Sequence, residues 1–396
     1  MTSLYPLRKA YGDVIRFGRA LKIRLISAVK APAEIRAIKN EPSFSSDSTY
    51  RIIVGPKNSA GASFQWARAL EQLSLPSGKK VETKVVQVDR GGGGNPNFNF
   101  TADINIGAHA YAGNLRSWRN RVLSRATHVV LESGGRITGN FLAGEPENEI
   151  RDLREAGIDV ALLFHGSDIR QASLHQRTVV DSPLKGSGAY WDAVRRNAES
   201  NLRLAQSFDG PILVSTPGLL AHVPGATWLP LVIDANRFSP HCPLMERKRP
   251  IVIHAPSNPK MKGTTQIEPV LEKLDLEGLI EYQRLSNIPH AEMPNFISKA
   301  DVVVDQVVLG DYGVLQCEAM AAGRLVLASV NIAQKFVPDL PVVHTTAATL
   351  EKLLRAAVST RRADFIQLAS KGPGYVATHH SSSSASKILA EQLNLT

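Results

Sequence analysis

The stretch that decides the fold runs over residues 300–323 and reads ADVVVDQVVLGDYGVLQCEAMAAG. Its apolar start, 300–304, is typical of a buried strand. A tight turn, Gly310-Asp311-Tyr312-Gly313-Val314, then opens a short helix that Gly323 ends. Gly313 lets a ligand approach the backbone closely, and the helix start offers unpaired N–H groups and positive potential. The segment therefore predicts a strand, a ligand-facing turn and a helix.

Glu318 lies one turn beyond Val314, where its carboxylate can accept hydrogen bonds from sugar hydroxyls. Together with the turn and the helix start, it forms a candidate site for a phosphate joined to a polyol, as in a nucleotide-sugar. An ordinary strand–turn–helix of a Rossmann-like sheet, with a glycine turn and an exposed glutamate, is the alternative.

A second segment, residues 251–264, reads IVIHAPSNPKMKGT. A β-branched strand at 251–253 leads into a loop, and Lys262-Gly263 stands at the entry of the next helix. A lysine there can bring a point charge to a diphosphate while the glycine clears space. A solvated surface lysine is the alternative, but the spacing of strand, lysine, glycine, helix and second strand favours a binding role.

Over most of residues 251–331 the sequence resembles family-four glycosyltransferases of the GT-B fold. Lys262-Gly263 matches the diphosphate-binding Lys-Gly of that family, and residues 318–323 match its Glu-Ala-Met-Ala-x-Gly. The family usually has another glutamate eight positions before Glu318, where this chain has Gly310, and Asp311 is the nearest substitute. Ser257 stands where an arginine usually precedes the lysine.

The resemblance implies a retaining, metal-independent glycosyltransferase that uses a nucleotide-diphosphate sugar and no cofactor. Lys262 and the amides near Gly313 would stabilise the departing diphosphate, Glu318 would hold the ribose, and residues 284–290 would meet the base. Asp311 would contact the sugar, and His165 would lie near the anomeric centre. The donor-binding candidates are Ser257, Lys262, Gly263, His290, Gly310, Tyr312, Gly313, Val314 and Glu318.

The N-terminal half carries the acceptor-side candidates. A strand at 51–56 is followed by a loop at 57–61 and a helix from 62 to about 73; in the resembled family this loop, with Asn58 and Gly61, borders the cleft. The apolar strand 160–164 runs into the sequence HGSDIR, so His165 and Asp168 emerge at a carboxyl end, where ligand-contacting groups collect. A histidine that caps the next turn is the alternative, and Asp168 is the candidate base if the reaction inverts configuration.

Length and composition predict two domains, because 396 residues with 43% hydrophobic content exceed one ordinary core. Short apolar strands alternating with helices predict an α/β protein with two Rossmann-like parallel sheets that face each other across a cleft. The predicted parts are a basic amphipathic extension at 1–48, an acceptor-side domain at 49–232, a nucleotide-sugar domain at 233–380 and a C-terminal helix at 381–396. The hinge is expected at 228–238, where Asp234 caps a turn.

The net charge of +10 suits several anionic partners. Nucleic acid is excluded as the expected partner, because the basic residues are spread along the chain, aromatic residues make up 6%, and no nucleic-acid-binding motif is present. Residues 11–30 are basic and amphipathic, so they could lie on an anionic membrane surface; packing on the protein or partial disorder is the alternative. The run 91–100 predicts a loop that faces the acceptor or simply connects elements at the surface.

Cellular location is predicted from cysteine usage and hydropathy. Cys242 and Cys317 are expected to be reduced thiols, and no apolar run approaches a membrane span or a secretion signal. The sequence therefore predicts a cytoplasmic protein, peripheral on the inner face of the membrane if residues 11–30 bind lipid. Residues 379–384 are expected to be a polar connection before a last helix at 385–393.

The sequence is compatible with two other functions. Gly310 in place of the usual glutamate is compatible with a nucleotide-sugar-binding or scaffold protein without turnover. A sugar-nucleotide epimerase or a phosphorylase on the same two-domain fold is the other candidate.

Overall fold

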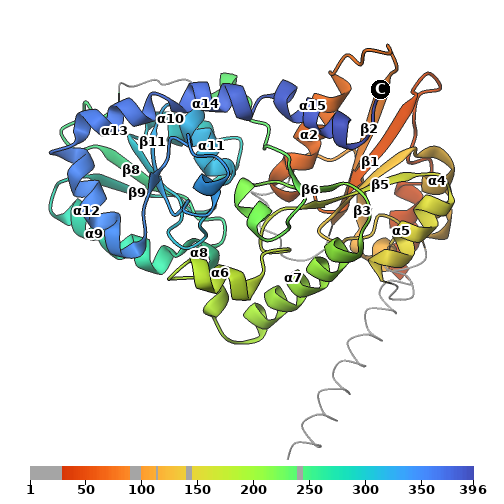
Figure 1. The fold of residues 1–396 in the computed structure, drawn as a ribbon, viewed down its shortest axis with the longest axis horizontal. Coiled ribbons are helices and arrows are strands. Elements are labelled where there is room, and N and C mark those ends of the chain that lie inside the picture. The colour runs from red at the N-terminus through yellow and green to blue at the C-terminus, as the bar shows by residue number, and fades with distance from the viewer. Residues whose placement is uncertain (1–28, 90–99, 113–114, 140–144, 239–243) are drawn as a thin grey trace, which may run out of the picture.

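The computed structural model describes residues 29–89, 100–112, 115–139, 145–238 and 244–396. These residues form two α/β domains that lie side by side, each with a parallel sheet between helices (Figure 1). The predicted fold class is confirmed. Both domains matter for the candidate site, because its cavities are lined by residues of each.

The N-terminal domain contains a seven-stranded sheet in the order β3-β2-β1-β4-β5-β6-β7, and every neighbouring pair is parallel. Its strands are β1 (Tyr50–Gly55), β2 (Val81–Asp89), β3 (Ile104–Gly107), β4 (His128–Glu132), β5 (Asp159–Phe164), β6 (Ile212–Val214) and β7 (Thr227–Trp228). Five of them were predicted, and β3 and β7 were not. Because β1, β4 and β5 occupy the middle, the loops after them meet at one edge of the sheet.

The C-terminal domain contains a five-stranded parallel sheet in the order β12-β11-β10-β8-β9. Its strands are β8 (Ile251–His254), β9 (Glu281–Arg284), β10 (Val302–Val304), β11 (Leu325–Ala328) and β12 (Val343–His344). All five were predicted. The strands β10 and β11 are buried along their whole length, which explains why their sequences are continuous apolar runs.

Helices cover both sheets. In the N-terminal domain they are α2 (Ala62–Glu71), α3 (Ala108–Ala112), α4 (Arg116–Arg125), α5 (Pro146–Glu155), α6 (Ala172–Thr178) and α7 (Ala189–Ser207). In the C-terminal domain they are α8 (Pro259–Lys262), α9 (Thr264–Leu276), α10 (Met293–Lys299), α11 (Val314–Ala321), α12 (Ala347–Val358), α13 (Arg362–Ala369) and α14 (Gly372–His379). Short 3-10 turns are η1 (Ser59–Gly61), η4 (Pro183–Lys185), η5 (Pro217–Ala221), η6 (Ala235–Arg237) and η7 (Ala333–Lys335).

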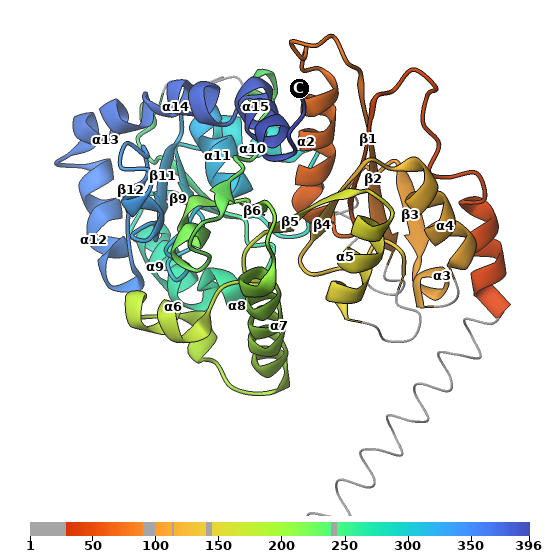
Figure 2. The same ribbon diagram turned by 45° about the vertical axis from the view of Figure 1, so that its right-hand side comes forward.

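The last helix, α15 (Ser382–Gln392), returns to the N-terminal domain and lies beside α2 (Figure 2). The carbonyl oxygen of Leu393 is 3.1 Å from His128 Nε2. Ser381 caps the helix, since its Oγ accepts a hydrogen bond from Ser384 N. The predicted start at 385 was therefore too late, because the serines before it form the first helical turn instead of a connection.

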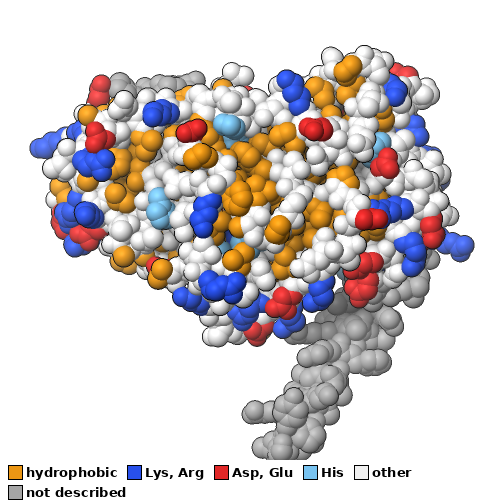
Figure 3. All heavy atoms as spheres, in the orientation of Figure 1, with side chains coloured by type: hydrophobic (Ala, Val, Ile, Leu, Met, Phe, Trp, Pro, Cys, Tyr) orange, Lys and Arg blue, Asp and Glu red, His pale blue; other side chains and the backbone are white. Residues whose placement is uncertain are grey.

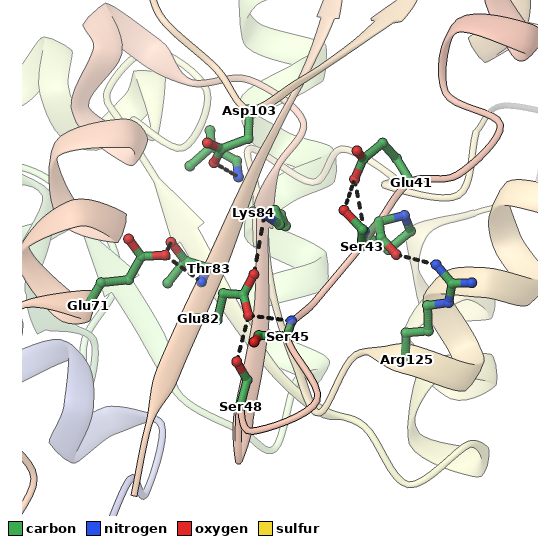
Figure 4. A network of polar contacts seen from close by, with 12 residues as sticks. Glu41, Ser43, Ser45, Ser48, Glu71, Glu82, Thr83, Lys84, Asp103 and Arg125 are labelled. Carbon is green, nitrogen blue, oxygen red and sulfur yellow. Dashed lines mark hydrogen bonds and ion pairs between the residues drawn. The ribbon is translucent and has the colours of Figure 1, made fainter.

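The described part of the predicted N-terminal extension is packed on the N-terminal domain. Figure 4 shows this contact: the carboxylate of Glu82 on β2 accepts hydrogen bonds from Ser45 N (2.7 Å) and Ser48 Oγ (2.5 Å). Arg125 on α4 donates to the carbonyl oxygen of Pro42 (2.7 Å). Residues 29–48 thus cover one side of this domain, whereas 1–28 lie outside the described residues.

The predicted hinge at 228–238 connects the two domains. Asp234 caps η6 by accepting a hydrogen bond from Asn236 N (3.1 Å), which confirms its predicted capping role. One apolar cluster continues through both domains, from Trp66 on α2 to Cys317 on α11 and Leu389 on α15. The domains are therefore joined by shared core packing as well as by the hinge.

Candidate active site

The crevice between the domains contains three neighbouring cavities, and Ala60 and Phe100 line all of them. The C-domain cavity has a volume of about 420 Å³, the hinge cavity about 630 Å³ and the N-domain cavity about 770 Å³. Hydrophobic side chains gather in the middle of the face that Figure 3 shows.

Lys262 lines the C-domain cavity from the end of α8. Its Nζ lies 2.8 Å from both carboxylate oxygens of Asp305, which follows β10 and is buried. Gly263 ends α8 with a positive φ of 73°. A Cβ at Gly263 would lie 2.9 Å from Val308, so the glycine permits the close packing that presents Lys262. Gly263 itself lines none of the three cavities.

Glu318 and His290 form a second pair that lines both the C-domain and the hinge cavities. Glu318 Oε1 lies 2.9 Å from His290 Nε2. The ring of Phe100, from the N-terminal domain, meets His290 edge-on at 5.6 Å. This pair therefore lies where the two domains approach each other.

The predicted base segment lies along the same C-domain cavity. Leu285, Asn287 and Ile288 line it, as does Ser257, which stands in the place of the usual arginine. Val314, the first residue of α11, lines both this cavity and the hinge cavity. One amide at the helix start is already used, because Gly313 N donates to Gln316 Oε1 (2.6 Å). First-turn amides of an α-helix lack partners within the helix, which makes the start of α11 a place where an anion can bind.

Asp311 and Tyr312 line none of the three cavities. The Asp311 carboxylate is buried and accepts hydrogen bonds from Arg170 Nη2 (3.3 Å), Thr216 Oγ1 (2.6 Å) and Gly218 N (3.1 Å). Burial raises its pKa, while the charge of Arg170 opposes that rise. The structure thus places this carboxylate against groups of the other domain and outside the three cavities, and its predicted contact with the sugar stays a prediction.

Tyr312 and Gly310 also serve the protein's own packing. The Tyr312 hydroxyl lies 3.2 Å from the Tyr375 hydroxyl and 3.1 Å from His380 Nε2. Gly310 has a φ of 69°, and a Cβ there would lie 2.8 Å from Ile332. The donor contacts predicted for Tyr312 and Gly310 stay predictions, since both residues are in contact with other parts of the protein. A Cβ at Gly313, in contrast, would have no described atom within 4 Å.

The N-domain cavity brings together His165, Asp168 and Asn58. His165 Nε2 lies 2.8 Å from Glu132 Oε1. Asp168 caps the turn after β5, because it accepts hydrogen bonds from His165 N (3.1 Å) and Gly166 N (2.6 Å). The capping residue is therefore Asp168, and the imidazole of His165 is directed to a carboxylate.

The acceptor-side loop is held by its own side chains. Asn58 is buried and left-handed (φ 48°), and its Nδ2 donates to the carbonyl oxygen of Thr101 (2.9 Å). Its Oδ1 accepts from Phe64 N (3.2 Å). Gly61 lines the hinge cavity at a φ of 72°. Asn58 thus shapes the cavity wall, and Gly61 allows Phe100 to approach.

Sequence reasoning missed two carboxylates of this site, Glu132 and Asp305. Both follow or end a predicted strand, at the carboxyl edge where ligand-contacting groups collect. That position was the signal that could have identified them. Their partners come from other elements: His165 follows β5, the neighbour of β4, and Lys262 ends α8, which follows β8, the neighbour of β10. The pairs therefore depend on strand order.

Some predictions concern residues that the structure does not describe. The membrane-surface segment 11–30 is described only at 29–30, the loop 91–100 only at Phe100, and Cys242 lies outside the described residues. Cys317 is a free, buried thiol. Among the described residues, no helix is both long and apolar enough to cross a membrane.

Comparisons with known proteins identify the fold. No protein-family model matches the chain, and no curated protein matches it in sequence. Among solved structures, it is similar to sucrose-phosphate synthase from Thermosynechococcus elongatus, with a TM-score of 0.56, 13% identity, and coverage of 87% of this chain and 98% of that one. It is also similar to Anabaena HepE, solved in complex with UDP-glucose, with a TM-score of 0.53, 10% identity, and coverage of 88% and 100%.

A third similar structure is WaaG, a glycosyltransferase involved in lipopolysaccharide biosynthesis, with a TM-score of 0.51, 14% identity, and coverage of 87% and 100%. At these identities the likeness defines the fold. The chain has the GT-B architecture of two Rossmann-like domains with a crevice between them.

Proposed function

We propose that the protein is a retaining glycosyltransferase that moves a sugar from a nucleotide-diphosphate sugar to a glycan, lipid-linked or small-molecule acceptor. One observation carries the proposal: Lys262, the start of α11 at Val314, and Glu318 face the same cavity between the domains of a GT-B fold. A cation, free helix amides and a carboxylate match a diphosphate joined to a ribose.

The donor is oriented by the strand edges of the C-terminal domain. Lys262 and the α11 amides stabilise the negative charge that develops on the departing diphosphate. Glu318 accepts hydrogen bonds from the ribose, and the apolar side chains of Leu285 and Ile288 cover the base. Metal independence is part of the proposal, because these groups supply the positive potential.

In the transfer, an acceptor hydroxyl forms a bond to the anomeric carbon while the bond from that carbon to the diphosphate oxygen breaks. The nucleoside diphosphate leaves with the electron pair, and the hydroxyl proton passes to the departing phosphate oxygen. The acceptor enters from the N-domain cavity, where Asn58 and Asp168 line the wall. Retention of configuration follows from the family resemblance.

A panel of nucleoside diphosphates tests the donor site. A ligand at a hundred times its Kd stabilises the folded protein by ~2.7 kcal/mol, so the preferred base is expected to raise the Tm most. The matching nucleotide-sugar is then incubated with candidate acceptors, and NMR of the product gives the anomeric configuration. A chain that binds no nucleoside diphosphate contradicts the proposal, and an inverted product contradicts its retaining part.

The second candidate is a nucleotide-sugar-binding protein without turnover. It is favoured by one observation, that the carboxylate nearest to the missing glutamate, Asp311, is held by Arg170 outside the three cavities. Donor binding without hydrolysis or transfer, across all nucleotide-sugars that bind, would support this candidate. An altered sugar without an acceptor product would indicate an epimerase, and phosphate-dependent cleavage a phosphorylase.

A further inference from the structure

A single buried carboxylate organises the N-domain side of the crevice. Glu132 ends β4 and is fully buried. Its Oε2 accepts hydrogen bonds from Lys57 N and Asn58 N, both at 2.9 Å. Its Oε1 accepts from Ser63 Oγ (2.5 Å) and lies 2.8 Å from His165 Nε2. With donors on both oxygens, Glu132 serves as an acceptor, as a carboxylate does.

The imidazole of His165 is fixed from two sides. Glu132 occupies Nε2, and the ring stacks on Trp66 with a centroid distance of 6.0 Å and an interplanar angle of 13°. Its side chain is 11% exposed and lines the N-domain cavity. Within the described part of the chain, no hydrogen bond to Nδ1 is found. Nδ1 is therefore the nitrogen through which His165 can meet a substrate.

We propose that Glu132 is a positioning residue: it holds His165 as a cation that presents Nδ1–H to the N-domain cavity, where His165 donates a hydrogen bond to the bound sugar substrate. This inference rests on the proposed function for the identity of the substrate. The pairing itself rests on the geometry of Glu132, His165 and Trp66.

The charges around His165 agree with this role. Burial on its own lowers the pKa of His165, but the hydrogen bond and charge of Glu132, together with the charge of Asp168, raise it above its ordinary value of 6.5. These two carboxylates come from β4 and from the loop after β5, and α2 contributes the uncharged Trp66. A cation here adds positive charge to a crevice in which Asp305 offsets Lys262.

The same carboxylate also fixes the loop between β1 and α2. Because Lys57 and Asn58 donate their backbone N–H groups to Glu132, that loop and His165 are positioned together. Loss of the carboxylate is therefore expected to change the charge state of His165 and the wall of the N-domain cavity at once. A readout of His165 alone is needed to separate these effects.

The test is an NMR titration of the histidine rings in the full chain, with His165 assigned by the signal that His165→Asn removes. In the wild type, the His165 midpoint is expected above pH 6.5, and Glu132→Gln is expected to lower it by about one pH unit or more. The matched control is Glu149→Gln, which changes a second buried carboxylate of this domain that binds Thr138 and backbone but no histidine. A wild-type midpoint below 6.5, which needs no variant to measure, overturns the proposal, as does a midpoint that Glu132→Gln leaves unchanged.

Kinetics then separate this inference from the proposed function. With a nucleotide-sugar that is turned over, kcat is expected to fall on the alkaline side at the His165 midpoint. Glu132→Gln should move that limb to lower pH, and above both midpoints kcat should fall about tenfold for each pH unit by which the limb moves. The inference is overturned, but the transferase is not, if kcat does not change with pH across the two His165 midpoints. The same holds if His165→Asn leaves kcat unchanged. A third outcome is that Glu132→Gln lowers the His165 midpoint but no nucleotide-sugar is turned over. That result contradicts both the transferase and the hydrogen bond from His165 to a sugar substrate, and it leaves only the Glu132–His165 ion pair.

Discussion

Two parts of one short segment, residues 311–312 and residues 314–318, face opposite ways. Asp311 and Tyr312 turn into contacts with Arg170, Tyr375 and other protein groups, whereas Val314 and Glu318 line the crevice. The separation occurs at the turn, where Gly310 has a φ of 69° and Gly313 is the N-cap of α11. The comparison teaches that one short segment can line the crevice and also hold the two domains together, through residues that are adjacent in the sequence.

Asp311 belongs to a set of polar contacts that joins α6 and η5 to the C-terminal domain, here called the seam. In Figure 1, α6 lies beneath that domain. His175 Nε2 lies 3.0 Å from the carbonyl oxygen of Leu309, and Asn331 Nδ2 donates to the carbonyl oxygen of Thr178 (3.2 Å). The buried Arg170–Asp311 ion pair lies beside these contacts. Opening the crevice along this seam therefore requires breaking a buried ion pair, so the seam sets the spacing of the two walls.

The largest expected effect comes from Asp311→Ala. It leaves Arg170 buried without its carboxylate, so the free energy of unfolding is expected to fall by ~3–5 kcal/mol. Urea denaturation of the full chain measures this loss. The matched control is Asp192→Ala, which breaks a half-buried pair with Arg195 on the surface of α7 and is expected to cost less than ~1 kcal/mol. An Asp311→Ala protein as stable as wild type, but unable to bind the donor, would make Asp311 a ligand group after all.

The next largest effect is expected for Lys262→Ala, on the ligand side of the comparison. Removing this cation should lower kcat by ~10²–10³, equivalent to ~2.7–4 kcal/mol, because the departing diphosphate loses its positive partner. Steady-state transfer from the nucleotide-sugar measures it. Lys260→Ala is the control, since Lys260 is on the same helix but lies over the ring of Tyr190.

Lys262→Ala also leaves Asp305 buried without a partner, so its loss of activity needs separation from a loss of stability. The double variant Lys262→Met with Asp305→Asn removes that buried charge. We expect it to recover stability in urea but not activity. Recovery of both would mean that Lys262 serves only to neutralise Asp305.

A third expectation concerns pH and the seam. Burial, helped by the charge of Arg170, lowers the pKa of His175 to about 4 from 6.5. As the pH falls, the unfolded chain takes up a proton on His175 at a higher pH than the folded chain does. The stabilisation that comes from burying neutral His175 is therefore complete above pH 6.5 and is lost progressively as the pH falls toward 4. At pH 5 the loss is about 2 kcal/mol. Urea denaturation at pH 7.5 and 5 should show a smaller pH dependence for His175→Gln than for wild type, and equal dependence would contradict the assignment.

Local patterns were sufficient for most of the fold. The strands β10 and β11 were predictable because they are apolar along their length and bounded by turn signals. The strands β3 and β7 were not, because they have only four and two residues and form the two edges of the sheet. Such short elements form because neighbouring strands supply hydrogen bonds, which is a tertiary effect.

In the site, the predictable residues were those whose position follows from sequence spacing alone. Lys262 is the last residue of a helix that Gly263 terminates, and Glu318 lies one turn into α11. The position of each side chain on its helix could therefore be inferred from the sequence. The direction of Asp311 could not, because it depends on Arg170, which is 141 positions away in the sequence. The pairing of Glu132 with His165 likewise depends on β4 lying beside β5.

The smallest effect is expected for Glu318→Gln, which tests whether the crevice-lining part of residues 311–318 binds the ribose. The amide keeps the shape and one acceptor oxygen, but it makes weaker hydrogen bonds to ribose hydroxyls than a carboxylate does. We expect a loss of ~1 kcal/mol in nucleoside diphosphate binding, a roughly fivefold rise in Kd, measured by calorimetry. Glu292→Gln, at the exposed start of α10, is the control and should leave the Kd unchanged. If Glu318→Gln lowers stability without raising the Kd, then the carboxylate of Glu318 stabilises the protein through His290 and does not bind the ribose. Of Val314 and Glu318, only Val314 would then be left as a donor-binding residue.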